Sequence, residues 1–340
     1  MTRFFLFLLL LPVFRTADGS LPRATESLTF LFYNVENLYD TTDDPYSGDN
    51  EFLPRSAKQW DQKKYSRKIA DIARVLAEVS GKNLPDVIGL CEVENRRVLD
   101  DLVRSPKITS GKYKYIHYND RDSRGIDMAL LYKPSAFHLI SGNLIRVKNS
   151  RGGIFARGIL YVTGRLTSGE ILHVFVNHWP ARTGDRVERE NSRKEIAAEL
   201  RRQTNDIRNR DKKALIVIMG DMNDEPGDVS LKNVLEAGPP GSSSRSGLVN
   251  LMIPSWQKGE GTVKFEKDWK MLDNLIVSET LTGKSGYHVE GNKGFVFRAP
   301  WMEYRSGNGQ VSPKRTYSGN TYSGGVSDHF PVYFRLVRQI

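Results

Sequence analysis

The sequence predicts a mixed fold of the α/β or α+β class. Two observations carry this prediction. A charged amphipathic helix pattern is twice followed by a short, almost wholly apolar segment of strand length, and further apolar segments of that length are spread evenly along the chain. Hydrophobic residues make up 39% of the 340 residues, which is enough for a large packed core and excludes a wholly disordered chain. One large domain or two small ones would fit this length.

The chain starts with the pattern of a secretory signal peptide. An apolar run at 4–14 follows Arg3 and ends in small and polar residues. The run is too short to cross a bilayer, and a buried N-terminal strand is the alternative interpretation. We therefore expect a leader at 1–19, a mature domain at 20–340 without a transmembrane segment, and export to the periplasm or the extracellular space. Cys91 is the only cysteine, so no intramolecular disulfide can stabilise the exported domain.

The predicted elements follow the periodicity of the apolar residues. The first strand is predicted at 28–33. Apolar residues then recur at spacings of three and four over 65–79, which indicates an amphipathic helix, and the strand 87–91 follows it. The same order returns with a charged helix over 188–208 and a strand over 214–219. Further strands are predicted at 128–132, 159–162, 171–176, 272–277 and 332–336.

Two segments are predicted to be surface loops. Residues 238–247 and 306–325 contain few core-forming side chains and many Gly, Ser and basic residues. A domain linker is the alternative interpretation of the first segment. Acidic and histidine residues of one chemical type lie on both sides of each segment, and a single domain would let them meet in one site.

Polar side chains of one chemical type stand where the predicted strands end. They are Asn34 and Glu36, Glu92, Asp221 and Asn223, and Asp328 and His329. Carboxylate and amide oxygens are the ligands that Mg²⁺ prefers, and positions left open for phosphate oxygens would suit phosphoester hydrolysis. Each residue alone is more often a turn or cap residue than a metal ligand. Their order along the chain is the more specific signal.

In order and local sequence, these pieces resemble the endonuclease/exonuclease/phosphatase superfamily, whose members include DNase I. The resemblance extends from Asn34 to Pro331 and includes the segments Gly220-Asp221-Met222-Asn223 and Ser327-Asp328-His329. It implies a DNase I-like, four-layer α-β-β-α sandwich in which two packed β-sheets carry helices on their outer faces. It also implies a metal-dependent hydrolase of phosphoester bonds that uses Mg²⁺, with Mn²⁺ as an alternative.

The resemblance assigns a role to each matching residue. The metal ligands would be Asn34, Glu92 and Asp328. Asp221 would orient or deprotonate the attacking water, and His329, kept protonated by Asp273, would stabilise the charge of the transition state. The remaining catalytic residues, which would donate hydrogen bonds to phosphoryl oxygens, are His178 and Asn223.

Basic residues near the motifs are predicted to contact the substrate. The formal net charge of +10 favours a polyanionic partner such as nucleic acid. The predicted substrate-binding residues of this kind are Arg124, Arg182 and Arg315. The family resemblance adds Asn177, because Asn177-His178 matches the asparagine-histidine step that the family carries at a strand end. Loop residues with the basic or aromatic character for phosphate contact and base stacking include Arg298, Trp301, Tyr304 and Tyr317. A structural role of the aromatic residues in their own loops is the alternative.

Three further residues are expected to support the site or the fold. Glu36 and Glu94 each lie two residues from a stronger candidate and would act as partners of the metal ligands. His173 lies within an apolar strand and is predicted to be structural.

The preferred function is that of an exported, monomeric nuclease that hydrolyses DNA or RNA. A phosphatase or a sphingomyelinase-type phospholipase is the first alternative. Inositol polyphosphate phosphatases usually carry a Pro-Ala-Trp-Cys-Asp-Arg segment where this chain has residues 270–274, which argues against that class. Exported sphingomyelinases often present an exposed aromatic hairpin to the membrane. This chain has no compact equivalent of it, although residues 295–301 could play a similar part. An inactive polyanion-binding module is the alternative from another class, and the presence of every motif residue argues against it.

Overall fold

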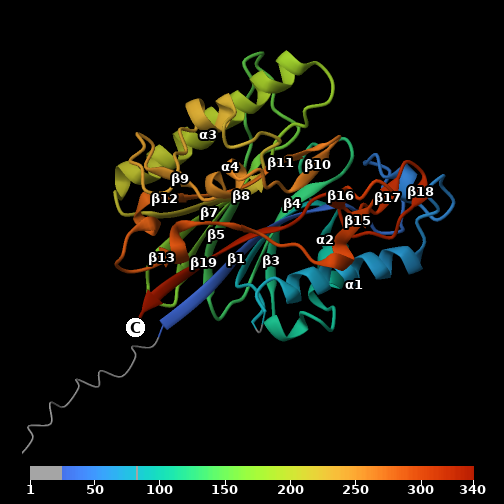
Figure 1. Cartoon of the computed structure of the whole chain (residues 1–340), viewed down its shortest axis with the longest axis horizontal. Coiled ribbons are helices and arrows are strands. Elements are labelled where there is room, and N and C mark those ends of the chain that lie inside the picture. Colours follow the sequence, from blue (N-terminus) through green and yellow to red (C-terminus); the bar gives the residue numbers. More distant parts are fainter. Residues whose placement is uncertain (1–24, 82) are drawn as a thin grey trace, which may run out of the picture.

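The computed structural model describes residues 25–81 and 83–340, so the predicted leader at 1–19 lies outside the described residues. The helices are α1 (Gln62–Glu78), α2 (Arg96–Val103), α3 (Arg186–Arg210) and α4 (Ile253–Gln257). Two β-sheets pack face to face, and α1 and α3 cover their opposite outer faces (Figure 1). The predicted four-layer α-β-β-α sandwich is therefore confirmed. Among the described helices, none combines the length and the apolar character needed to cross a membrane.

Both sheets are mixed, with parallel and antiparallel neighbours. In order across the first sheet, the strands are β13 (His288–Val289), β19 (Val332–Gln339), β1 (Thr25–Leu38), β2 (Val87–Val93), β4 (Asp127–Tyr132) and β3 (Lys114–His117), and β14 (Phe295–Val296) also pairs with β19. In the second sheet they are β5 (Phe137–Ile145), β6 (Ile159–Leu166), β7 (Ile171–His178), β8 (Leu215–Asp221), β12 (Asp273–Ser278) and β9 (Leu248–Asn250). Three short hairpins are formed by β10 (Val263–Phe265) with β11 (Asp268–Lys270), β15 (Glu303–Arg305) with β16 (Val311–Pro313), and β17 (Tyr317–Ser318) with β18 (Thr321–Tyr322).

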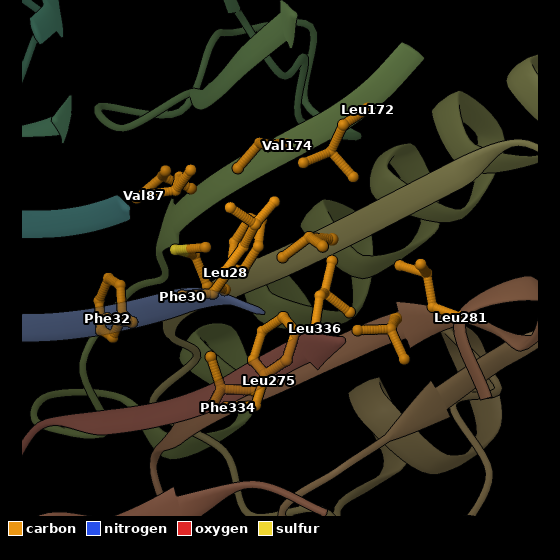
Figure 2. Packing of buried hydrophobic residues seen from close by; sticks show 14 of the residues in the cluster. Leu28, Phe30, Phe32, Val87, Leu172, Val174, Leu275, Leu281, Phe334 and Leu336 are labelled. Carbon is orange, nitrogen blue, oxygen red and sulfur yellow. The ribbon is translucent and has the colours of Figure 1, made fainter. Parts of the chain in front are cut away.

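Alternation of side chains along the strands produces three apolar layers. In β1, Phe30 and Phe32 belong to the cluster between the sheets, whereas Leu31 and Tyr33 belong to the cluster under α1 and α2. The rings of Phe30 and Phe334 stack with their centroids 5.1 Å apart. Figure 2 shows this central cluster, in which side chains from both sheets point toward one another. A third cluster packs α3 against the outer face of the second sheet.

The two long helices begin at aspartate caps. Asp61 accepts a hydrogen bond from the backbone nitrogen of Lys64 at 2.9 Å, and Asp185 accepts one from that of Glu188 at 2.8 Å. Both bonds satisfy a donor that the first helical turn leaves free. The helix starts therefore lie a few residues earlier than the apolar periodicity alone predicts.

Every predicted helix and strand is present, with bounds that differ by a few residues. The segment 238–247 has no helix or strand, as predicted. The segment 306–325 is different, because it forms most of two hairpins and buries Tyr317. The ring of Tyr317 packs against Trp60 and Phe52 at centroid distances of 6.0 and 6.1 Å. Its Gly- and Ser-rich composition concealed a packed element that lies over the end of β1.

Two parallel strand pairs bring the predicted site residues to one edge of the sandwich. β1 and β2 run parallel, which places Asn34 beside the residue that precedes Glu92. β7 and β8 also run parallel, and His178 lies opposite Asp221. β12 is antiparallel to β8 and starts with Asp273 opposite Asp221. The carboxyl ends of four strands and the start of a fifth therefore meet at one place.

Candidate active site

Asp221, the last residue of β8, is the centre of the site. Its side chain is 3% exposed. Asn34 Nδ2 donates to its Oδ2 at 3.1 Å, and the backbone nitrogen of Asn223 donates to its Oδ1 at 3.0 Å. The Nε2 atoms of His178 and His329 each lie 3.8 Å from Oδ2. Burial raises the pKa of Asp221 to about 7, against the opposing charge of His329. A carboxyl group that changes charge near neutral pH is suited to act as a general base.

His329 and Asp273 form a buried pair. His329 Nδ1 lies 2.7 Å from Oδ2 of Asp273, whose side chain is almost completely buried. Burial alone would lower the pKa of His329, but the charges of Asp273 and Asp221 and the hydrogen bond outweigh it and raise this pKa well above its usual range. His329 is therefore a cation at neutral pH, and its second nitrogen lies on the side of Asp221.

His178 is in the opposite charge state. Its side chain is 4% exposed, and its Nε2 lies 3.7 Å from Oε1 of Glu92. Burial lowers the pKa of His178 well below its usual value, and the charges of Arg157 and Arg124 lower it further. The site therefore combines one cationic and one neutral imidazole, and a neutral imidazole carries one N–H that can donate to an oxygen.

The backbone at three of the strand ends adopts left-handed angles. Glu36, Asn37, Glu92 and Asn223 have φ values of 48°, 53°, 65° and 48°. Such angles cost on the order of 1 kcal/mol or more in residues other than glycine, and they concentrate at functional sites. In β2 this turn places Oε2 of Glu92 to accept a hydrogen bond from the backbone of Asn37 at 2.9 Å.

The donor set suits a hard divalent cation. Glu92 is 12% exposed at its side chain, and Asn34 stands at the end of the neighbouring parallel strand. Asp328, 27% exposed at its side chain, lies in the loop that leads into β19. Carboxylate and amide oxygens of this kind are the ligands that Mg²⁺ and similar ions prefer. The three predicted ligands could therefore hold such an ion at the mouth of the site.

A second group also has metal-like spacing. Asp221, Asp273 and His329 offer ligand atoms within 4.8 Å of one another. His329 is the protonated partner of Asp273 in this geometry, and a protonated imidazole is a poor ligand. We therefore interpret this group as an acid–base arrangement rather than as the cation site.

Glu36, Glu94 and His173 hold structural contacts. Glu36 accepts hydrogen bonds from the backbone nitrogen of Thr316 at 2.7 Å and from Nε of Arg315 at 3.1 Å. Glu94 accepts one from the backbone of Asp40 at 2.6 Å, in the loop after β1. His173 shares a 2.7 Å hydrogen bond with Tyr161 within the second sheet. The structural role expected for His173 agrees with this position. The side chains of Glu36 and Glu94 contact Arg315, Thr316 and Asp40 rather than a predicted metal ligand, so their role as partners of the metal ligands stays a prediction.

Arg124 lines a basic cleft whose walls also include Pro180, two residues after His178. Its side chain is 44% exposed and lies 3.5 Å from Asp122. Arg157, which the sequence reasoning missed, contacts Asp122 at 2.5 Å and donates to the carbonyl of Trp179 at 3.3 Å. With Arg189 these residues line a cleft of about 490 Å³. Arg157 stands in a short turn before β6 with no motif around it, so no local sequence signal marked it.

Arg182 and Arg315 are tied to acidic partners. Arg182 donates to the carbonyl of Asn223 at 2.7 Å and to Asp224 at 3.2 Å, so it braces the turn after β8. Arg315 bridges Glu36 and Asp328, with its Nη2 2.8 Å from the latter. Both side chains remain partly exposed, at 43% and 58%, and both can still reach a bound anion.

The position of Asn177 does not fit the expected substrate contact. The residue is completely buried. Its Oδ1 accepts a hydrogen bond from the indole of Trp179 at 3.1 Å, and its Nδ2 donates to the carbonyl of Met219 at 3.4 Å. Neighbouring residues of a strand point to opposite faces, so only one of Asn177 and His178 can face the site. Asn177 instead fixes the segment that carries His178.

The expected stacking residues are mostly occupied within the fold. The guanidinium of Arg74 lies 3.9 Å from the ring centroid of Trp301. Arg298 donates to a backbone carbonyl at 2.8 Å, and Tyr317 is buried. Tyr304 is 55% exposed and is the member of this group that can offer a ring to a ligand.

Lys68 is a completely buried lysine beneath the site. Its Nζ donates to the carbonyl of Glu36 and to Oγ1 of Thr316, each at 2.5 Å, and to the carbonyl of Val326 at 3.1 Å. It thereby ties together the end of β1, the β17 segment and the loop before Asp328. The burial of Lys68 was not predicted from the sequence, although its position three residues after Tyr65 lies on the apolar stripe of α1.

We expect Lys68→Met to lower the free energy of unfolding by about 3 kcal/mol. Three buried oxygen acceptors would lose their donor, and the buried carboxylate of Glu36 would lose a nearby positive charge. Urea unfolding followed by circular dichroism would measure the change. Lys63→Met, on the exposed face of the same helix, is the matched control and should change stability by less than about 0.5 kcal/mol. Equal stability of the two variants would contradict a structural role for the Lys68 ammonium.

Comparison with known proteins gives one family match and several structural matches. The model of the Endonuclease/Exonuclease/phosphatase family matches residues 29–338. No curated protein matches the chain. Among solved structures, an endonuclease/exonuclease/phosphatase family protein from Bacteroides thetaiotaomicron is 17% identical with a TM-score of 0.58, and the match covers 94% of this chain and 98% of that chain.

Two further structures have the same fold. A mannosyl-6-phosphatase from B. thetaiotaomicron VPI-5482 is 17% identical with a TM-score of 0.57, covering 91% of this chain and 99% of that chain. TDP2 from D. rerio, complexed with a single-strand DNA product, is 14% identical with a TM-score of 0.56, covering 91% and 98%. Identities this low establish similarity of fold alone.

Proposed function

Since the chain belongs to the endonuclease/exonuclease/phosphatase family, whose members are metal-dependent phosphoester hydrolases, we propose that it is a phosphodiesterase that cleaves nucleic acid. The observation that carries this proposal is the cleft lined by Arg124, Arg157 and Arg189, whose walls also include Pro180, two residues after His178. Arginines in a groove next to a phosphoryl-transfer site suit the backbone of a polyanion. The D. rerio TDP2 structure, with its single-strand DNA product, is a precedent for such a substrate on this fold.

The site residues divide the work of hydrolysis. Asp221 orients the attacking water and takes its proton, for which a pKa near neutrality is appropriate. His329, charged by its pairing with Asp273, donates toward the oxygens of the phosphoryl group as negative charge builds on them. The neutral His178 donates a further hydrogen bond from the opposite side.

Asn223 supports this arrangement through its backbone. Its amide nitrogen holds Asp221, while its side-chain nitrogen donates to the carbonyl of Trp179 at 2.9 Å. Direct donation to a phosphoryl oxygen, as the family resemblance implies, uses the second hydrogen of that amide group.

Asn34, Glu92 and Asp328 are the residues that would hold the divalent ion, Mg²⁺ or alternatively Mn²⁺, which would neutralise phosphate charge when bound. Arg315 bonds Asp328 in the present geometry, so we expect its guanidinium to move toward the substrate when the carboxylate takes a metal. The partly exposed position of Arg315 is consistent with both roles, the contact with Asp328 and the contact with substrate.

We also propose that the protein is exported as a monomer after removal of residues 1–19. Expressed with its own N-terminus in a bacterium that secretes through the general pathway, the mature chain should begin near Ser20. Intact-mass measurement of the periplasmic and extracellular fractions, with size-exclusion chromatography, tests both statements. Retention of the full-length mass inside the cell would reject the export proposal.

Substrate class is tested with the mature protein on double-stranded DNA, single-stranded RNA, sphingomyelin and a soluble phosphomonoester. Each is incubated with Mg²⁺, Mn²⁺ or EDTA. We expect loss of DNA or RNA that needs the metal and disappears in Asp221→Ala. Hydrolysis of the lipid or the monoester alone would retain the site and reject the nuclease proposal in favour of an activity like that named for the mannosyl-6-phosphatase.

The two titrating groups predict a bell-shaped pH profile of kcat/KM. Activity should rise with pH through about 7, because Asp221 must lose its proton to act as a base. It should fall at higher pH, because the pKa of His329 is raised and the imidazolium survives well above its usual range before losing its proton. A bound cation favours the Asp221 carboxylate and moves the rising limb to lower pH. Initial rates from pH 5 to 10 at fixed metal concentration would measure both limbs.

A further inference from the structure

A small pocket opens beside the catalytic cluster, between the loop that precedes α1 and the turn at 315–319. It measures about 160 Å³, and its walls include Phe52, Lys58, Arg315 and Tyr317. The volume corresponds to about five water molecules, which suits a single phosphate-sized group. We refer to it as the Lys58 pocket.

Lys58 is held firmly in this pocket but is weakly neutralised. Its side chain is 11% exposed, and its Nζ lies 5.3 Å and 5.6 Å from the ring centroids of Phe52 and Tyr317. Among the described residues its carboxylate partner is Glu51, at 3.0 Å, and that side chain is 72% exposed. Exposed pairs of this kind contribute little free energy, so a bound anion can displace Glu51 at small cost.

Arg315 supplies the second cation. Two of its nitrogens contact Glu36 and Asp328, and Nη1 has no hydrogen-bond partner in the described part of the chain. The Glu36 carboxylate also borders the pocket, but the backbone of Thr316 and Nε of Arg315 already donate to its two oxygens. Both oxygens of Glu36 are thus already hydrogen-bonded, and the donors that can bind an anion in the pocket are the ammonium of Lys58 and Nη1 of Arg315.

The Lys58 pocket lies one side chain away from the reacting centre. Arg315 contacts Asp328 at 2.8 Å, and Oδ1 of Asp328 lies 3.9 Å from Nε2 of His329. Arg157, which lines the basic cleft, contacts the carbonyl of Trp179, the residue after His178. Cationic side chains therefore lie near both histidines of the site, and the volume of the Lys58 pocket suits one phosphate group.

We propose that the Lys58 pocket binds a second phosphate group of the substrate, adjacent to the scissile phosphoester. The proposal rests on the proposed function, since in a nucleotide chain this group is the next backbone or terminal phosphate. Two phosphates on a small molecule would present the same chemistry. The enzyme consequently prefers substrates in which two phosphate groups are neighbours.

The test uses three dinucleotides that share one phosphodiester and carry no terminal phosphate, a 5′-phosphate or a 3′-phosphate. In the wild type, a phosphate on one of the two ends should raise kcat/KM for the diester about tenfold through charge-assisted hydrogen bonds. Lys58→Gln should abolish that ratio, and Lys63→Gln, an exposed lysine on α1, should preserve it. Glu51→Gln should increase the ratio, because it removes the competing carboxylate. Thermal unfolding of each variant verifies that it is folded.

Persistence of the tenfold ratio in Lys58→Gln, or its absence with both phosphorylated dinucleotides in the wild type, would overturn the proposal. If only longer strands are cut, the same comparison is made with neutral methylphosphonate linkages on either side of the scissile bond.

If no nucleic acid is cut, the proposed function fails, and a hexose bisphosphate is compared with the hexose monophosphate. A preference for the bisphosphate that depends on Lys58 would then support the pocket with a small-molecule substrate, and no such preference would reject it.

Discussion

Replacing Asp221 with asparagine should lower kcat by about 10³-fold while leaving stability within about 1 kcal/mol of the wild type. In the proposed mechanism no other carboxylate can take the proton of the attacking water, so the rate loss is that of a missing general base. The stability follows from the raised pKa of Asp221, because burial disfavours the carboxylate in the folded state. That unfavourable contribution is absent below the usual aspartate pKa, grows as pH rises from there to about 7, and is constant above it. Asparagine removes it, and this offsets the hydrogen bond that Asn34 loses.

Asp224 is the matched control for Asp221. It is buried three residues further along the chain, where it lies 2.9 Å from Arg193 and accepts a hydrogen bond from Ser230 at 2.6 Å. Asp224→Asn should lose about 2 kcal/mol of stability, since it leaves a buried guanidinium without its charge partner, and should retain most of kcat. Single-turnover kinetics and urea unfolding of both variants separate the two effects. A large rate loss in Asp224→Asn with full activity in Asp221→Asn would reject our assignment of the base.

The strand ends could be predicted from the sequence. A short apolar segment of five or six residues that follows a helix pattern is best interpreted as a buried strand, so its last residue marks a strand end. Residues such as Glu92 and Asp221 follow these segments directly, and parallel pairing then brings them together. The period of two along a strand could also have shown that only one of Asn177 and His178 faces the site, and the fold selects His178. That constraint was in the sequence, but the asparagine–histidine step was treated as one unit.

Contacts between distant loops could not be predicted in the same way. Lys68 reaches Thr316, 248 positions away, and Arg315 reaches Glu36, 279 positions away. No periodicity links such residues, and the composition of 306–325 suggested a solvent-exposed loop. The acidic partners of Arg182 likewise lie more than forty positions later in the chain, so its pairing was hidden until the fold placed them together. The candidate catalytic residues at the strand ends could therefore be predicted from the sequence. The long-range hydrogen bonds and ion pairs that position them could not.

Asp273→Asn should reduce kcat/KM by about 10²- to 10³-fold and should also destabilise the protein, by about 3 kcal/mol. Asparagine has nearly the same shape but no charge, so His329 loses the largest of the interactions that oppose the effect of its burial, and its pKa falls. At neutral pH the imidazole then becomes neutral and can no longer stabilise phosphoryl charge. The falling limb of the pH profile should move to lower pH, and activity should partly recover in acid.

The combined pattern distinguishes a catalytic pairing from a structural one. NMR titration of His329, assigned with the His329→Gln variant, would report its pKa directly in the wild type and in Asp273→Asn. If the residue serves the fold alone, stability falls but the falling limb of kcat/KM stays in place. If the falling limb of the kcat/KM profile moves by the same amount as the pKa of His329 measured by NMR, then both measurements report the same proton. The charge of the His329 imidazole is then linked to turnover. Asp221→Asn, which loses rate without stability, and Asp273→Asn, which loses both, thus assign base and cation separately.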